Sequence, residues 1–250
     1  MSNNHPEQQT GEGKGKLLNV PGISTSVDFQ GKTTSRMKKQ KNMYHFIHVA
    51  EDNFHVMDKF RRLNSSIDPI VSLNEQELSV FCDSFKLRTL AKNEFFLEQG
   101  QVCSYIGFIN QGVMIYFKSM DNGNEITTDF AFEGEWVTVN ASRLNNSPSP
   151  VSIRAIENTE ILVINQQDLS CLYLRVPKLE RLGRILIEQA YLKIVGQSLD
   201  LQTLSAKDRY ESLLHKYPEI FQKVPLYHIA NYLGIAPKSL SRIRSDFFAK

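Results

Sequence analysis

The strongest constraint on the fold of this chain lies at residues 227–247, where small, flexible and apolar residues are spaced as in two short helices joined by a tight turn. Ala230 is small where two helices must approach closely, and Gly234, four residues later, can adopt the positive φ that ends a helix. Leu240 follows six residues on and can fill the angle between the helices. This spacing predicts a helix-turn-helix.

The residues around the turn also predict which faces of the two helices pack together. Apolar side chains recur at helical spacing in both segments: Leu226, Ile229, Leu233, Leu240, Ile243 and Phe247. The outward face of the second helix then carries short hydrogen-bonding and long cationic side chains: Lys238, Ser239, Ser241, Arg242 and Arg244. Such a set suits the base edges of a DNA major groove, so these residues are the candidate DNA-binding site. A helical hairpin with a charged, solvated face is the alternative that spacing alone leaves open.

Charge is distributed unevenly along the chain. Residues 205–250 contain eight Lys and Arg against four Asp and Glu, whereas residues 57–204 carry four more acidic than basic residues. The nearly neutral total of +2 at pH 7 therefore conceals a basic end on an acidic body. A small basic domain of this kind is expected where a protein meets the phosphates of double-stranded DNA.

Size and composition narrow the class of protein. With 250 residues, 41% of them hydrophobic, the chain can bury a core and form one or two domains. It has no apolar run that could cross a bilayer and no signal-peptide core, so we expect a cytoplasmic protein without a membrane partner. Cys82, Cys103 and Cys171 form no CxxC pair, which argues against a disulfide framework or a metal site. No glycine-rich phosphate loop and no nucleophile with a recognisable partner is present, so we predict neither an enzyme nor a cofactor.

The first two segments of the chain differ in their patterns. Residues 1–56 are polar and basic without a sustained period, and we expect a disordered or partly helical extension, whose place in the native protein the sequence leaves open. Residues 57–170 contain short β-type runs separated by turn residues, which predict an antiparallel β-roll, or jelly roll. Within it, Asn122-Gly123 predicts a hairpin with a type I′ turn.

The last two segments are helical, which makes the fold class α+β. Residues 171–204 predict a long helix with two apolar stripes, of which one can lie on the roll and the other can meet its copy in a second subunit. The predicted dimer contact is Leu182, Ile185, Leu192, Val195 and Leu199. Burial of both stripes within one chain is the alternative. Residues 205–250 form the predicted helix-turn-helix domain.

This order of parts resembles the Crp/Fnr family of bacterial transcription regulators over roughly residues 73–248. The resemblance is carried by the roll hairpin with Gly123, by Phe-Glu-Gly-Glu-Trp-Val at residues 132–137, and by the segment from Ile229 to Arg244. The last segment, with Asp-Arg-Tyr at residues 208–210 and Val-Pro-Leu at residues 224–226, looks like a branch common in Bacteroidetes.

The resemblance implies a homodimer in which the second helix of each motif enters the major groove at one half of a palindromic site. Carried over by position, Lys238 and Arg242 meet base edges, and the fork of Arg242 suits the two acceptors of guanine. The implied partners are double-stranded DNA, a second copy of the chain, RNA polymerase and a small-molecule effector of unknown identity.

The effector site departs from the cyclic-nucleotide members of the family. Those members place Gly-Glu-Leu and, later, Arg-Ser/Thr-Ala at the ligand, where the glutamate holds the ribose and the arginine neutralises the phosphate. Here the two places are residues 138–140 and 149–151, which offer neither group. A buried phosphate without a cation is costly, so we expect no cyclic AMP binding in the usual mode. Arg143 or Arg154 is the alternative cation, although Arg154 falls in the next predicted strand. The candidate effector pocket is Trp136, Thr138, Val139, Asn140, Ser149 and Pro150.

Two hypotheses for the whole chain follow. The first is a homodimeric, sequence-specific regulator whose roll biases the orientation of two recognition helices. The alternative is an effector-binding or protein-interaction module that has lost DNA readout. Oxygen sensing of the Fnr type is not expected, because it needs an N-terminal cysteine cluster and the first cysteine here is Cys82.

Overall fold

The computed structural model describes residues 59–248, which lie in one compact unit that spans residues 54–250. The extension predicted for residues 1–56 lies outside the described residues. A helical stretch at residues 59–67 and α2 (Glu75–Asp83) precede the strands. No helix of the described part is long and apolar enough to cross a membrane.

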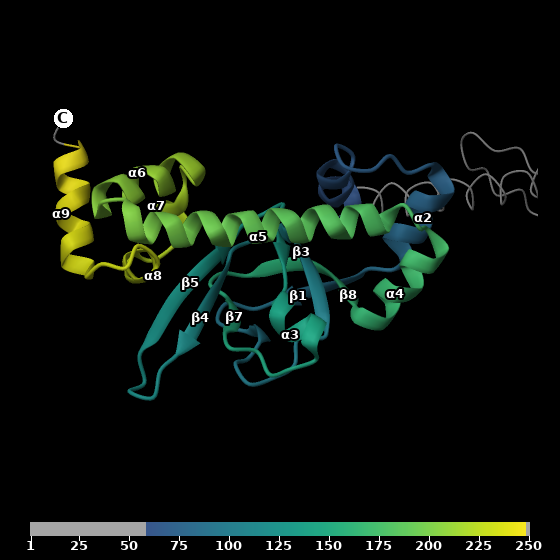
Figure 1. Ribbon diagram of the computed structural model, residues 1–250, viewed down its shortest axis with the longest axis horizontal. Helices are drawn as coiled ribbons and strands as arrows, with labels where there is room; N and C mark the ends of the chain where they lie inside the picture. The colour runs from purple at the N-terminus through teal and green to yellow at the C-terminus, as the bar shows by residue number, and fades with distance from the viewer. Residues whose placement is uncertain (1–58, 249–250) are drawn as a thin grey trace, which may run out of the picture. The chain divides into compact units, whose positions relative to one another are not determined.

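Two antiparallel sheets form the body of the protein (Figure 1). The strands are β1 (Lys86–Leu90), β2 (Phe95–Leu97), β3 (Tyr105–Gln111), β4 (Met114–Ser119), β5 (Glu125–Ala131), β6 (Trp136–Val137), β7 (Ser152–Ala155) and β8 (Thr159–Asn165). Their orders are β1-β8-β3-β6 and β2-β7-β4-β5, and every pair is antiparallel. The short helix α3 (Asn140–Asn145) lies between β6 and β7 along the chain. The predicted β-roll and the α+β class are thereby confirmed.

Strand β4 is apolar on both faces because both faces are buried. Met114 and Tyr116 belong to a hydrophobic cluster that joins the two sheets. Ile115 and Phe117, which alternate with them along the strand, belong to a different cluster that includes residues of the C-terminal helices. The outer face of this sheet is therefore covered by protein, and the continuous apolar run has a physical reason.

The turn of the β4–β5 hairpin is longer than the sequence predicted. Gly123 has a φ of +80°, but Asn122 does not have the positive φ that a type I′ turn requires, so that part of the prediction is wrong. Instead, the Met120 carbonyl accepts from the Gly123 amide, and the Met120 amide donates to the Asn124 carbonyl, both at 2.9 Å. The hairpin itself is confirmed, with β4 paired to β5.

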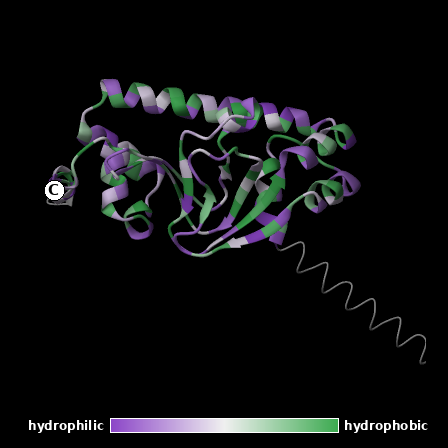
Figure 2. Cartoon of the chain, turned by 90° about the horizontal axis from the view of Figure 1, so that it is seen from below, coloured by the Kyte–Doolittle hydropathy of each residue, from purple (hydrophilic) through white to green (hydrophobic). Residues whose placement is uncertain are grey.

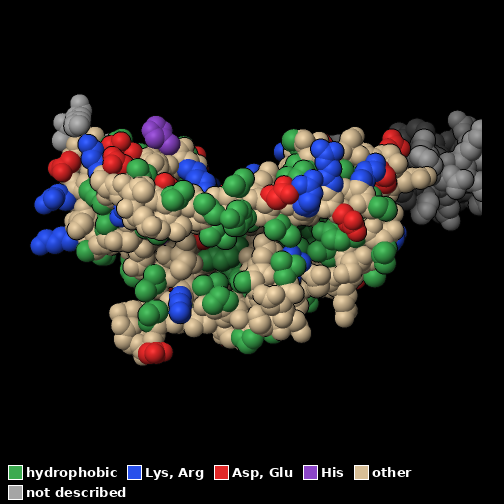
Figure 3. All heavy atoms as spheres, in the orientation of Figure 1, with side chains coloured by type: hydrophobic (Ala, Val, Ile, Leu, Met, Phe, Trp, Pro, Cys, Tyr) green, Lys and Arg blue, Asp and Glu red, His purple; other side chains and the backbone are tan. Residues whose placement is uncertain are grey.

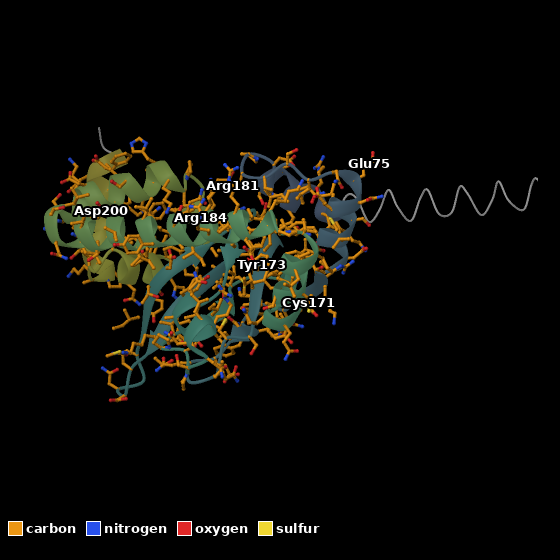
Figure 4. The ribbon with its side chains drawn as sticks, turned by 45° about the vertical axis from the view of Figure 1, so that its right-hand side comes forward. Glu75, Cys171, Tyr173, Arg181, Arg184 and Asp200 are labelled. Carbon is orange, nitrogen blue, oxygen red and sulfur yellow. The ribbon has the colours of Figure 1, made fainter. Side chains whose placement is uncertain are left out.

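Helices follow the roll to the end of the described chain. They are α4 (Gln166–Arg175), α5 (Leu179–Thr203), α6 (Ala206–Lys216), α7 (Ile220–Lys223), α8 (Leu226–Tyr232) and α9 (Pro237–Phe248). Residues 171–175, which we assigned to the long helix, belong to α4. Figure 4 shows how far α5 reaches, with Arg181 and Arg184 beside the roll and Asp200 among the C-terminal helices.

Candidate nucleic-acid interface

Helix α8, the turn and α9 form the predicted helix-turn-helix. Gly234 follows α8 with a φ of +67°, and α9 begins at Pro237, whose fixed φ suits the first position of a helix. Ala230 and Leu240 are fully buried in one hydrophobic cluster, and α8 contacts α9 directly. The geometry predicted for Ala230, Gly234 and Leu240 is confirmed.

The outward face of α9 carries most of the side chains that we expected there. Lys238, Ser239, Ser241 and Arg242 are exposed, and cationic side chains project from the edge of the protein that α9 forms (Figure 3). Lys238 and Arg242 are four residues apart, so they lie on the same side of the helix. Neither side chain has a hydrogen bond or ion pair with another residue in the range 59–248. Both cations are therefore available to an anionic or hydrogen-bonding partner.

Arg244 does not belong to this outward face. Its guanidinium lies over the ring of Phe221 in α7, 4.7 Å from the ring centroid, and its Nε is buried without a hydrogen-bond partner in the described structure. Position 244 falls two residues after Arg242, on a side of α9 that turns toward the domain's own core. The prediction that Arg244 faces outward is wrong, and the candidate site keeps four residues: Lys238, Ser239, Ser241 and Arg242.

Helix α8 also binds to the roll, which the sequence did not predict. The hydroxyl of Thr127 on β5 lies 2.8 Å from Nδ1 of His228 on α8, and both residues are buried. Two residues earlier on β5, the Glu125 carbonyl accepts from the Tyr227 hydroxyl at 2.8 Å and from Nδ2 of Asn231 at 2.9 Å. The first helix of the motif is thus hydrogen-bonded to the β4–β5 hairpin.

Hydrophobic packing surrounds these hydrogen bonds. The roll and the C-terminal helices share one cluster, whose buried members are Val113, Ile115, Phe117, Phe130, Tyr210, Leu213, Ile220, Val224, Ile229, Ala230, Leu233 and Leu240. At its edge, Phe130 packs on Tyr232 with ring centroids 5.0 Å apart, and Phe132 packs on Tyr217 at 4.4 Å. Because this cluster is continuous, moving the helix-turn-helix away from the roll would expose aromatic side chains to water.

The long helix α5 presents an apolar side to solvent. Figure 2 shows apolar and polar residues interspersed along this helix, and Figure 3 shows hydrophobic side chains over its middle. The exposed apolar residues on it are Ile187, Tyr191, Leu192, Ile194, Leu199 and Leu201. Of the predicted dimer residues, Leu192 and Leu199 are exposed, while Ile185 and Val195 are half-buried.

Leu182 is the exception among the predicted dimer residues. It is buried in the cluster that α5 forms with α2, α4 and the roll, together with Leu179 one turn earlier. A side chain already enclosed by its own chain cannot contact a second copy. The prediction for Leu182 is wrong because the first turns of α5 pack on the roll, and only the later turns leave a side open.

The residues of the candidate effector pocket face more than one part of the roll. Trp136 packs edge-on against Phe108, with centroids 5.1 Å apart, in the cluster that includes α2 and α4. Val139 instead belongs to the cluster between the two sheets. Trp136 therefore lies outside the interior of the roll, and its assignment to the pocket is wrong.

The polar members of that set are bonded within the chain. The Thr138 hydroxyl donates to a carbonyl of β3 at 3.0 Å, and the Ser149 hydroxyl donates to the carbonyl two residues on at 2.6 Å. The side-chain oxygen of Asn140 accepts from Nη2 of Arg143 at 2.9 Å, and Pro150 is exposed.

The two alternative cations for the roll are also engaged. Arg143 on α3 is buried and donates to Gln166 at 2.6 Å as well as to Asn140, and burial lowers the pKa of its guanidinium below its usual value. Arg154 lies on β7, as expected, where it forms two bonds of 3.0 and 2.7 Å with the Glu125 carboxylate. Its guanidinium is 4.5 Å from the ring centroid of Phe117, on the outer face of the sheet. Arg154 therefore cannot serve a ligand between the sheets.

Known proteins are similar to this chain in both sequence and fold. The cyclic nucleotide-binding domain family matches residues 87–175. The transcriptional activator protein Anr of Pseudomonas protegens is 28% identical over 191 residues, which are 71% of this chain and 77% of that protein. FnrA of Stutzerimonas stutzeri, also a transcriptional activator, is 26% identical over the same shares of the two chains. The chain is a homologue of the Crp/Fnr-type transcriptional activators.

Solved structures support the fold of this Crp/Fnr homologue. FixK2 of Bradyrhizobium japonicum superposes with a TM-score of 0.60 at 14% identity, over 66% of this chain and 85% of that chain. A transcriptional regulator of the Crp/Fnr family from Eubacterium rectale gives a TM-score of 0.54 at 18% identity, over 71% and 84% of the two chains. At such identities the likeness establishes the shared fold. The homology to Anr and FnrA supports DNA-binding transcription regulation.

Proposed function

We propose that this Crp/Fnr homologue is a homodimeric, sequence-specific regulator that inserts α9 of each subunit into the major groove of DNA. The observation that carries the proposal is the exposed side of α9. Lys238 and Arg242 lie together on that side, and their side chains have no hydrogen bond or ion pair within the described residues. Arg242 donates to the two acceptors of a guanine, while Lys238 meets a neighbouring base or phosphate. Ser239 and Ser241 flank the two cations with short hydrogen-bonding groups, although the Ser241 hydroxyl also donates to the Pro237 carbonyl at 3.1 Å.

The dimer forms through the later turns of α5. Leu192 and Leu199 are separated by seven residues, so they return to the same side of the helix and can pack against the same residues of a second α5. Exposed apolar residues in such a number are typical of an interaction surface rather than of a solvated helix. Two parallel α5 helices place both recognition helices at the same end of the dimer.

The roll does not hold cyclic AMP in the usual mode. Val139, at the place of the family's ribose-binding glutamate, is a buried apolar residue between the sheets, and Ser149, at the place of the arginine, bonds to its own loop. Neither position offers the charge that a cyclic phosphate needs. The effector is therefore a different small molecule or is absent.

The remaining partners and the location follow from this function. A transcription regulator acts in the cytoplasm on double-stranded DNA, with RNA polymerase as its further protein partner. The homologues are transcriptional activators rather than enzymes, and the proposal includes no catalytic step.

Selection of bound duplexes from a random DNA pool tests the proposal. Purified wild type at near-physiological salt should enrich a palindrome whose half-sites lie about one helical turn apart. Arg242→Ala should relax the preference at one base position in each half-site, and Ser245→Ala, on an exposed residue of α9 outside the proposed contact set, should leave it unchanged. Equal enrichment by wild type and Arg242→Ala would contradict the assignment of Arg242.

A further inference from the structure

We propose that Thr127 and His228 are positioning residues, which fix the helix-turn-helix in one register on the roll and thereby determine the half-site spacing that the dimer accepts. The inference rests on the proposed function, because a spacing preference exists only for a dimer that binds DNA. The Thr127–His228 pair is the buried hydrogen bond of 2.8 Å between β5 and α8.

Hydrophobic packing holds the helix-turn-helix on the roll but does not select one register. Apolar contact is non-directional, so it tolerates small shifts of α8 on the sheet that a hydrogen bond does not. The hydrogen bond is directional. A shift of α8 by one turn would separate His228 Nδ1 from the Thr127 hydroxyl and leave both groups buried without partners, which proteins avoid. The pair therefore disfavours the neighbouring registers.

A second polar contact braces the same arrangement. Tyr227 and Asn231 are one turn apart on α8, and both donate to the carbonyl of Glu125. The Glu125 carboxylate is in turn held by Arg154 from β7 through two hydrogen bonds. Three side chains of α8 are thus hydrogen-bonded to two residues of β5, and β5 is in turn bonded to β7 through Arg154.

The position of α8 on the roll also determines the position of α9. The two helices contact each other across the fully buried Ala230 and Leu240, so they move as one body. In a dimer joined through α5, the position of each α8 on its own roll sets the distance and angle between the two recognition helices. One base pair of added spacing shifts a half-site by about 3.4 Å and turns it by roughly a tenth of the helical repeat, which a fixed pair of helices cannot follow.

Protonation of His228 provides a probe of the same contact. The charged and titratable groups that face it are Arg154 from β7, Glu125 from β5 and its neighbour Tyr227 on α8. Burial, followed by the positive charge of Arg154, lowers the pKa of His228 below its ordinary value of 6.5, although Glu125 opposes this shift. The docked register binds fewer protons than a displaced one. The free-energy difference that favours the docked register over a displaced one is therefore fully present above pH 6.5, and it decreases as the pH falls below that value.

A spacing series tests the proposal. Duplexes carry the two selected half-sites at the preferred spacing and at one or two base pairs more or less, and binding is measured by fluorescence anisotropy. Wild type should prefer one spacing by about tenfold over its neighbours, in line with the cost of a single defect in a DNA site. The double variant Thr127→Val/His228→Leu replaces both polar partners by apolar groups of similar size. It should keep its melting temperature but distinguish the spacings less sharply than wild type, and the preference that remains is held by the Tyr227 and Asn231 bonds to Glu125.

Two controls make the outcomes distinct. Thr127→Ser keeps the hydroxyl and should keep the wild-type preference. Wild type should distinguish the spacings less sharply at pH 5.5 than at pH 7.5, because the lower pH disfavours the docked register, and this comparison needs no variant to fold. An unchanged preference in the folded double variant, or a sharper preference at pH 5.5 than at pH 7.5, overturns the role of the pair. Failure of wild type to bind any duplex overturns the proposed function instead.

Discussion

Replacing Leu192 and Leu199 by Glu should dissociate the proposed dimer. The two side chains are 65% and 55% exposed, so more than half of each remains to be buried by a partner. Full burial of a leucine is worth about 1.5–3 kcal/mol, and completing it here is worth about 1–2 kcal/mol for each side chain. A symmetric dimer contains four such side chains, or about 4–8 kcal/mol, which corresponds to three or more orders of magnitude in the dimer dissociation constant.

Sedimentation equilibrium over a range of concentrations measures this directly. Wild type should be dimeric where Leu192→Glu/Leu199→Glu is monomeric, and circular dichroism should show that the variant keeps its helical content. Leu174→Glu is the matched control, since Leu174 is 83% exposed but lies on α4 rather than on α5. It should leave the dimer intact. If the double variant forms dimers over the same range of concentrations as wild type, the assignment of the dimer contact to this side of α5 is refuted.

Four further predictions concern the C-terminal domain and its contact with the roll. Arg242→Ala should cost about 1–3 kcal/mol in binding to the selected site, measured by anisotropy at fixed salt, and should do so at one base position only. Leu240→Ala should lower the free energy of unfolding by about 2–5 kcal/mol in urea titrations, because the side chain is fully buried between α8 and the rest of its cluster. Gly234→Ala should lower it by about 1 kcal/mol, since the residue has a φ of +67°. Stability should decrease as the pH falls below 6.5 and the depressed pKa of His228 is approached, and a variant with His228→Leu should lack this component; an identical pH profile would exclude His228 as its source.

Local spacing explains why the helix-turn-helix was predictable from sequence. The roles of Ala230, Gly234 and Leu240 depend on residues within about ten positions of one another, and helical geometry converts those spacings into contacts. The strands of the β-roll were predictable from short β-type runs between turn residues, and the Asn122-Gly123 turn predicted the β4–β5 hairpin. The other pairs of the described sheets, such as β1–β8 and β2–β7, join strands that are distant in the sequence, so local pattern could not give them.

The orientation of the helices and strands was harder to predict. Spacing shows which residues share one face of an element, but it does not show which face the rest of the protein buries. Arg244 and Leu182 were placed outward on their helices, yet one stacks on Phe221 and the other is buried on the roll. Trp136 was assigned to the interior of the roll, but in a two-residue strand it faces the α2 and α4 cluster instead.

The docking of α8 on β5 could not be derived from local pattern at all. Thr127 and His228 are 101 residues apart, and neither stands out in its own segment. One signal was present: Val113 to Phe117 is apolar at consecutive positions, which is typical of a strand covered on both faces. The sequence could thus have shown that something covers β4, but not that the helix-turn-helix does so.

The most direct test of sequence-specific DNA binding is the equilibrium affinity of the wild-type protein for its selected palindrome, compared with a scrambled duplex of the same composition at near-physiological salt. The proposed pair of recognition helices predicts binding to the palindrome about a thousandfold or more tighter than to the scrambled sequence. Equal affinity for the two duplexes would show that the exposed cations of α9 meet only phosphates, and would contradict the assignment of this Crp/Fnr homologue as a sequence-specific regulator.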